Sequence, residues 1–243
     1  VCQFTIMPFI GMSLAILSGF PPEIAAGIIL VGCAPGGLAS NVMAYISGAN
    51  LALSLSLTAI STLVAPFATP MLMSLLAGEY IPIDAVAMFW SITKIVILPV
   101  IAGLVFNHFM HGKYPIVDRA MPIVSMIGIV VIIAVITAAG RDTLITLGFT
   151  LIAIIMLQNI LGLALGYGVA RLIRMDEPSA RAIAFEVGMQ NSGLASGIAV
   201  EMGRVATMGI APAIFGPVMN INGSILASFW RKTASSTKDS NGN

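Results

Sequence analysis

The stretch FEVGMQNSG, residues 185–193, places a carboxylate, two amides and a hydroxyl among apolar residues. It is preceded by ARAIA and followed by LASGIAV, so Glu186 stands inside a segment that otherwise suits a membrane interior. Two glycines, Gly188 and Gly193, enclose the rest of the polar group and weaken any helix that runs through it. The fold and the function therefore depend on what holds this polar group in place.

The composition of the chain indicates that its solvent is lipid. Of 243 residues, 58% are hydrophobic and 9% are charged, against roughly 25% charged in soluble globular chains. The net charge of +1 and the lack of a Lys/Arg run argue against a nucleic-acid partner. No nucleophile–base arrangement suggests an enzyme, and no motif suggests an organic cofactor. Cys2 and Cys33 are predicted to be buried thiols.

Apolar segments of sufficient length predict an all-α polytopic membrane protein. A helix needs about 20 apolar residues to cross a bilayer, and the chain offers eight such segments. They are 1–17, 23–47, 50–76, 84–110, 119–138, 145–173, 179–203 and 208–230. The polar tail 231–243 is predicted to be disordered. The apolar opening at Val1 lacks the features of a signal peptide, and we expect an N-terminally truncated fragment.

The basic residues predict the orientation in the membrane. With the loops assigned alternately to two sides, one side receives only Arg141 and Arg204. The other side receives Lys113, Arg119, Arg171, Arg174, Arg181, Arg231, Lys232 and Lys238. This bias predicts a cytoplasmic C-terminus, and the short loops and tail favour a bacterial inner membrane.

Two stretches of the chain resemble each other. VGCAPGGLAS at 31–40 and VGMQNSGLAS at 187–196 agree at six of ten positions, 156 residues apart. Pro22 and Pro178 stand at the same offset, each before its segment. Five predicted crossings separate the copies, so the second is upside down relative to the first. This inverted-topology repeat is typical of secondary transporters.

Both copies interrupt a predicted span with Gly or Pro, which disfavour a continuous helix. A broken helix survives in lipid only where it is buried in protein or lines a cavity. The half-helix N-termini near residues 38 and 192 suit an anionic group, and the carbonyls freed at the breaks suit a cation. The sequence thus predicts a buried site for charged ligands.

Glu186 lies about 12 Å into its span when counted from Pro178 at about 1.5 Å per residue. A carboxylate at that depth costs at least about 2.5–3.5 kcal/mol on insertion scales. No Lys or Arg nearby is an obvious partner, so a bound cation is the favoured interpretation. A protonated Glu186 in a proton relay and a structural carboxylic acid bonded to backbone are the alternatives.

Other polar residues could complete such a site. Ser54 and Thr58 share a helix face, and Thr62 is predicted to continue it. These hydroxyls could instead bond their own helix or mediate packing. Asn220 and Ser224 share a face of the last span, with Asn222 nearby. They could line a substrate cavity or form hydrogen bonds between helices, and both readings stay open.

PGGLASN, the pair Ser54 and Thr58, and EVGMQNSGLA together resemble the bile acid:sodium symporter family over essentially the whole chain. The resemblance implies ten helices in two inverted repeats, with a core that contains two crossed, broken helices and a panel that moves against it. Eight of the ten helices would be present. The core would comprise residues 1–76 and 145–230, including the broken helix 179–203, and the panel residues 84–138.

The resemblance also implies ligands for two sodium ions. The first ion would be bound by Ser40, Asn41, Ser54, Thr58 and Glu186. The second would be bound by Gln3, Glu186, Gln190 and the backbone carbonyls of Val187 and Met189. The substrate would contact Leu38, Ala39, Asn191, Ser192 and Asn220 or Asn222. Some relatives carry a hydroxyl residue where this chain has Leu38, which weakens any transfer of substrate identity.

The predicted function is sodium-coupled symport of an organic anion, either a bile acid or a small carboxylate such as pantoate. The alternative is a cation/proton antiporter in which Glu186 titrates, and a second rival is a membrane receptor that keeps the fold without transport. The expected partners are lipid and a small anion. The sequence specifies neither the anion nor the oligomeric state.

Overall fold

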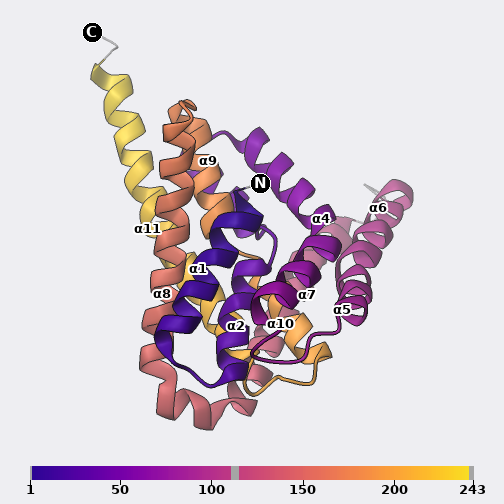
Figure 1. Ribbon diagram of the computed structural model, residues 1–243. Helices are drawn as coiled ribbons and strands as arrows, with labels where there is room; N and C mark the ends of the chain where they lie inside the picture. Colours follow the sequence, from indigo (N-terminus) through magenta and orange to yellow (C-terminus); the bar gives the residue numbers. More distant parts are fainter. Residues whose placement is uncertain (1, 111–114, 241–243) are drawn as a thin grey trace.

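The structure is a computed structural model that describes residues 2–110 and 115–240. Every regular element in these ranges is a helix (Figure 1), which confirms the all-α prediction. The elements are α1 (Gln3–Ser18), α2 (Pro22–Cys33), α3 (Ala39–Ile46), α4 (Leu51–Ala77), α5 (Ala85–Ile92), the π-helix η1 (Thr93–Ile97), α6 (Leu98–Met110), α7 (Pro115–Ala139), α8 (Arg141–Leu172), α9 (Glu177–Gly188), α10 (Ser192–Glu201) and α11 (Ile210–Ser240).

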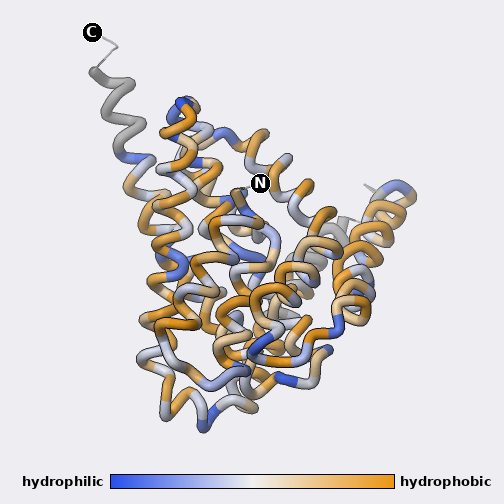
Figure 2. Tube along the Cα trace, in the orientation of Figure 1, coloured by the Kyte–Doolittle hydropathy of each residue, from blue (hydrophilic) through white to orange (hydrophobic). Residues whose placement is uncertain are grey.

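Four helical stretches in the described part of the chain are long and apolar enough to cross a membrane. They are Leu51–Ala77, Ala85–Phe106, Arg141–Leu172 and Ile210–Lys232. Hydrophobic residues predominate along most of the helices (Figure 2), and large apolar side chains such as Phe67, Leu104 and Phe149 are exposed. The chain is therefore a helical membrane protein.

Two predicted spans are each divided into two helices, as the glycine and proline pattern indicates. The span 23–47 forms α2 and α3, with residues 34–38 between them. Pro35 has no backbone donor, and two glycines follow it, so the helix cannot continue there. The span 179–203 forms α9 and α10. Asn191 caps α10, because its side-chain oxygen accepts a hydrogen bond from the Leu194 N–H at 3.0 Å.

Helices α1 and α2 pack along each other, and α8 and α9 do the same. Close packing depends on small residues at the contacts. A Cβ atom on Gly162 of α8 would lie 3.0 Å from the Cα of Gly188, and one on Gly188 would lie 2.5 Å from Leu163. The last helix, α11, packs against α8, α2, α10 and α3. Helices α1, α8 and α11 thus pack against the two broken helices, α2–α3 and α9–α10.

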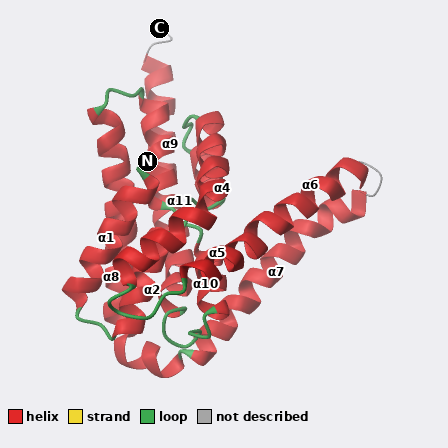
Figure 3. Ribbon diagram, turned by 45° about the vertical axis from the view of Figure 1, so that its right-hand side comes forward, coloured by secondary structure: helices red, strands yellow, loops and turns green. Residues whose placement is uncertain are grey.

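Helices α6 and α7 form a long hairpin that extends away from this bundle (Figure 3). It joins the bundle through α5 and η1, which contact α4 and α10, and through the end of α7, which contacts α11 and α8. The π-helical turn contains Lys94, an exposed cation inside an apolar stretch. Most side chains of the hairpin whose burial the structure describes are exposed.

Polar contacts hold the broken helices at both ends. At one end the buried Arg181 of α9 donates to Glu177 (2.9 Å) and to the backbone oxygens of Ser47 (3.2 Å) and Trp230 (3.3 Å). Partial burial acts to raise the pKa of Glu177, but hydrogen bonds from Tyr167 and Arg181 outweigh it and hold that pKa below its ordinary value. Arg181 thus ties α9 to the end of α3 and to α11.

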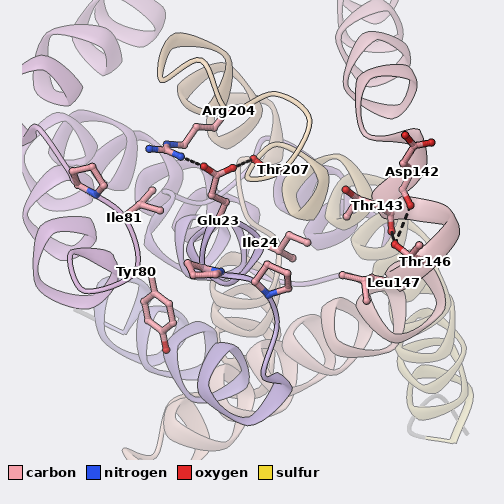
Figure 4. Close-up of a pocket in the computed structure, with 13 residues that line it drawn as sticks. Glu23, Ile24, Tyr80, Ile81, Asp142, Thr143, Thr146, Leu147, Arg204 and Thr207 are labelled. Atoms are coloured by element: carbon pink, nitrogen blue, oxygen red, sulfur yellow. Dashed lines mark hydrogen bonds and ion pairs between the residues drawn. The ribbon is translucent and has the colours of Figure 1, made fainter.

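At the opposite end Glu23, in the first turn of α2, accepts from Arg204 and Thr207 (Figure 4). These two residues belong to the loop between α10 and α11. The contact borders a cavity of about 720 Å³ that also includes Asp142 and Thr143 of α8. Each end of the pair of broken helices is therefore tied to a neighbouring element by a charged side chain.

The C-terminal tail differs from the prediction. Residues 231–240, expected to be disordered, continue α11 to Ser240, and 241–243 lie outside the described residues. The physical reason is that RKTASSTKDS contains neither Gly nor Pro, so nothing in it stops the helix.

Candidate functional site

The two breaks meet at one point inside the bundle. Gly36 and Gln190 form an isolated antiparallel bridge. The Gly37 N–H donates to the Met189 oxygen at 2.8 Å, and the Asn191 N–H donates to the Pro35 oxygen at 2.8 Å. Backbone groups released by each break are thus satisfied by the other, as a lipid environment requires. A Cβ on Gly37 would lie 2.6 Å from the Gln190 oxygen, so the crossing needs glycine there.

Glu186 lies beside this crossing with 3% of its surface exposed. Its Oε2 atom accepts from the Thr58 hydroxyl at 2.7 Å and the Ser40 hydroxyl at 3.0 Å, and its Oε1 accepts from Ser61 at 3.3 Å. The ion pairs among the described residues do not include Glu186. A buried carboxylate is thus surrounded by neutral oxygens, and a Cβ added at Gly36 would collide with it.

The first predicted set of ion ligands is brought together. Asn41 Oδ1 accepts from Ser54 at 2.8 Å and lies 3.4 Å from the Thr58 hydroxyl oxygen, next to the carboxylate that Ser40 contacts. The structure places Ser61, rather than Thr62, against Glu186. Ser61 is seven residues after Ser54, close to two full turns at 3.6 residues per turn, whereas Thr62 is eight residues after it and has turned further from the Ser54 side. Strict application of the 3.6 period would have identified Ser61.

The second predicted set also converges. The Gln3 amide donates to the Ala34 oxygen at 2.9 Å and to the Gln190 side chain, which in turn donates to the Val187 oxygen. The Met189 oxygen accepts from Gly37, as described above. The Gln3 Oε1 atom is buried and has no hydrogen-bond partner in the described structure. An unsatisfied buried acceptor costs about 1–3 kcal/mol, which a cation beside it would offset.

The surroundings of these oxygens fit a hard cation. A cavity of about 240 Å³ reaches Gln3, Ser61, Glu186 and Val187. Carboxylate, hydroxyl, amide and carbonyl oxygens are the ligands that hard cations take. Among the described residues there is no group of three or more His, Cys, Asp or Glu side chains that could hold a metal ion. The donor set therefore suits an alkali or alkaline-earth ion rather than zinc.

A second cavity, of about 350 Å³, lies against the crossing and reaches α7 and α11. Five of the six predicted substrate residues line it: Leu38, Ala39, Asn191, Ser192 and Asn220. The beginnings of α3 and α10 are at its wall, so their backbone N–H groups favour negative charge there. Asn222 does not line this cavity. Its amide donates to Asn159 of α8 at 2.8 Å, because it is two residues, and so more than half a helical turn, away from Asn220.

Comparison with known proteins gives a consistent result. The family model described as the sodium bile acid symporter family matches residues 1–147. The chain is 43% identical to the uncharacterized sodium-dependent transporter YocS of Bacillus subtilis, over 96% of this chain and 72% of that protein.

Plant relatives match over a similar length of this chain. The probable sodium/metabolite cotransporters BASS1 of rice and of Arabidopsis thaliana, both chloroplastic, are each 34% identical to it, over 94% and 96% of this chain. The chain spans only 56% and 58% of these two proteins. All three names describe transporters rather than enzymes.

Proposed function

This chain belongs to the sodium bile acid symporter family, and we propose that it couples sodium entry to the uptake of an organic anion. The observation that carries the proposal is Glu186, a buried carboxylate whose neighbours are neutral oxygens at the crossing of two broken helices. Its burial is unfavourable unless a proton or a cation compensates the charge. The relatives' names supply the cation, since all of them include sodium.

Two sodium ions would share Glu186. The first would be coordinated by Ser40, Asn41, Ser54 and Thr58 together with the carboxylate. The second would be coordinated by Gln3, Gln190 and the carbonyls of Val187 and Met189, again with the carboxylate. The unsatisfied Gln3 oxygen supports this second site. Because the ligands come from α1, α3, α4, α9 and the break that follows α9, bound sodium would hold both broken helices in one arrangement.

The anion would bind in the 350 Å³ cavity, against the N-termini of α3 and α10 and the Asn191 side chain. This volume is at the lower end of the range of about 300–1,000 Å³ typical of ligand pockets. We therefore favour a small carboxylate, such as pantoate, over a bile acid. Sodium and anion are coupled if both stabilise the same conformation.

The proposed topology is that of an inverted repeat with eight spans in a bacterial inner membrane. The four long helices would cross the membrane alone, and α1, α7 and the pairs α2–α3 and α9–α10 would complete the crossings. The C-terminus would be cytoplasmic. Of the basic residues that support this orientation, Lys113 lies outside the described part of the chain.

Uptake measurements on the intact protein in proteoliposomes test the proposal. A panel of labelled carboxylates is offered at fixed pH with an inward sodium gradient or with potassium in its place. We expect at least one carboxylate to accumulate only with sodium. Accumulation driven by a pH gradient alone would favour the antiporter with a titrating Glu186. Binding without flux would favour a receptor.

A further inference from the structure

Asn159 of α8 and Asn222 of α11 form a polar connection to the broken helix that the ion sites themselves do not explain. Asn159 is fully buried. Its amide donates to the Gly188 oxygen at 2.8 Å, and its Oδ1 accepts from the Asn222 amide at 2.8 Å. Gly188 is the last residue of α9, so this bond satisfies one of the carbonyls that the break releases.

The position of Asn159 mirrors that of Gln3. It stands 156 residues after Gln3, the same offset that relates the two VG-containing repeats. Gln3 lies on α1 and donates to Ala34, directly after α2, while Asn159 lies on α8 and donates to Gly188, at the end of α9. In both repeats an amide from the neighbouring helix therefore bonds a carbonyl at the break.

The two amides differ in what their oxygens do. The Gln3 oxygen has no hydrogen-bond partner, whereas the Asn159 oxygen is occupied by Asn222. At the same offset from Glu186 and Gln190 the first repeat has Leu30 and Ala34, which provide no charge or amide. Asn159 thus occupies the position equivalent to that of Gln3. The residues equivalent to Glu186 and Gln190, however, give no side-chain ligand that could complete an ion site around Asn159.

From these contacts we propose that Asn159 and Asn222 are positioning residues for the second sodium site, an inference that depends on the proposed function. The bond from Asn159 fixes the plane of the peptide between Gly188 and Met189. The neighbouring carbonyls of Val187 and Met189, which would face the ion, are then held in direction. Asn222 acts through Asn159 by holding its amide in the donating orientation.

Close contact between α8 and α9 makes this connection possible. Gly162 and Gly188 bring the two backbones together, so the short Asn159 side chain reaches the carbonyl directly. Gln158, the preceding residue, is also fully buried but donates to the Ile28 oxygen of α2 at 3.1 Å, away from α9. It provides a matched control, because truncating it removes a buried amide bond without touching the break.

The test is a sodium titration of thermal stability on the purified intact protein. Sodium chloride replaces potassium chloride at constant total salt. Fitting the gain in stability to RT ln(1 + c/Kd), where c is the sodium concentration, gives an apparent Kd for sodium, and this Kd is the sodium midpoint. We expect Asn159→Ala to raise the sodium midpoint roughly threefold to tenfold, as for the loss of one hydrogen bond. Asn222→Ala should raise it less, and the double variant no more than Asn159→Ala alone. Gln158→Ala should lower the melting temperature but keep the wild-type midpoint.

The outcomes separate this inference from the proposed function. If Asn159→Ala keeps the wild-type sodium midpoint while Glu186→Gln abolishes the sodium response, that result contradicts the positioning role of Asn159 and still supports the ion site at Glu186. A sodium response that persists in Glu186→Gln overturns the ion site itself. If Asn159→Ala does not fold, Asn222→Ala decides, and an unchanged midpoint in that variant contradicts the positioning role. An equal increase in Gln158→Ala would also contradict it.

Discussion

The two broken helices cross at one point but contribute different chemistry to it. The break at residues 34–38 carries no ionisable side chain, and its glycines allow the backbones to approach and leave room for the Glu186 carboxylate. The break at residues 189–191 follows Glu186 and contains two amide side chains. The two breaks thus differ in the side chains that they bring to the crossing. The first break makes space for charge, and the second supplies it.

The largest effect is expected from removing the charge. Glu186→Gln keeps the shape of the side chain but provides no negative charge to attract a cation, so sodium-driven uptake should fall to the background level. The matched control is Glu201→Gln, the same change at an exposed position at the end of α10. The measurement is anion uptake by proteoliposomes at limiting sodium. Wild-type uptake by Glu186→Gln would place the site elsewhere.

The next effect tests the space made by the first break. In Gly36→Ala the new methyl group would collide with the Glu186 carboxylate, so we expect loss of most uptake and a lower melting temperature. Gly168→Ala is the control, because a Cβ on that α8 residue meets nothing within 4 Å. Replacing glycine by alanine there should stabilise the helix by about 0.5–1 kcal/mol. Equal behaviour of both variants would contradict the close approach at residue 36.

A smaller effect is expected from the hydroxyls that face the charge. Thr58→Val removes the donor 2.7 Å from Glu186 and preserves the shape of the side chain. Because Thr58 would also provide its oxygen to the first sodium ion, and contacts to charged groups contribute about 1.5–3 kcal/mol, the sodium concentration for half-maximal uptake should rise about tenfold or more. Thr62→Val, the same change at a threonine that makes none of the described hydrogen bonds to Glu186, should leave it unchanged. Similar shifts in both variants would indicate a general effect on α4 instead.

The smallest effects on ion binding are expected at the two ends of the broken helices. Arg181→Ala removes two bonds to backbone oxygens and the pair with Glu177, and should destabilise the protein by about 1–3 kcal/mol. Arg204→Ala removes a partly exposed pair with Glu23 and should cost less than about 1 kcal/mol. Thermal unfolding in detergent measures both. A large shift of the sodium midpoint with little change in the melting temperature would show that these ends control the site directly.

Much of the site follows from local patterns in the sequence. The Gly and Pro residues at the two repeats located both breaks, and the compensation of the isolated charge of Glu186 by a cation stays a prediction. Ser40 and Asn41, expected from the family resemblance to bind the first ion, lie beside Glu186 and Ser54 in the structure, and their role as ion ligands stays a prediction.

Contacts between distant helices were harder to predict. Asn222 could not be placed, because its direction depends on how α11 packs against α8. Asn159 and Gln158 were missed, since adjacent amides in an apolar span give no sign of which helix each one faces. The continuation of α11 through the polar tail was missed because the polar composition of the tail suggested disorder. Residues 231–240, however, contain neither Gly nor Pro to end the helix.

The central claim is that sodium compensates the charge of Glu186 where the two broken helices cross. Equilibrium binding of radioactive sodium to the purified intact protein, wild type beside Glu186→Gln, tests it most directly. The account predicts saturable binding of two ions by the wild type, and loss of both in the variant because both sites share the carboxylate. Sodium binding that is unchanged in Glu186→Gln, or absent from the wild type, would contradict it.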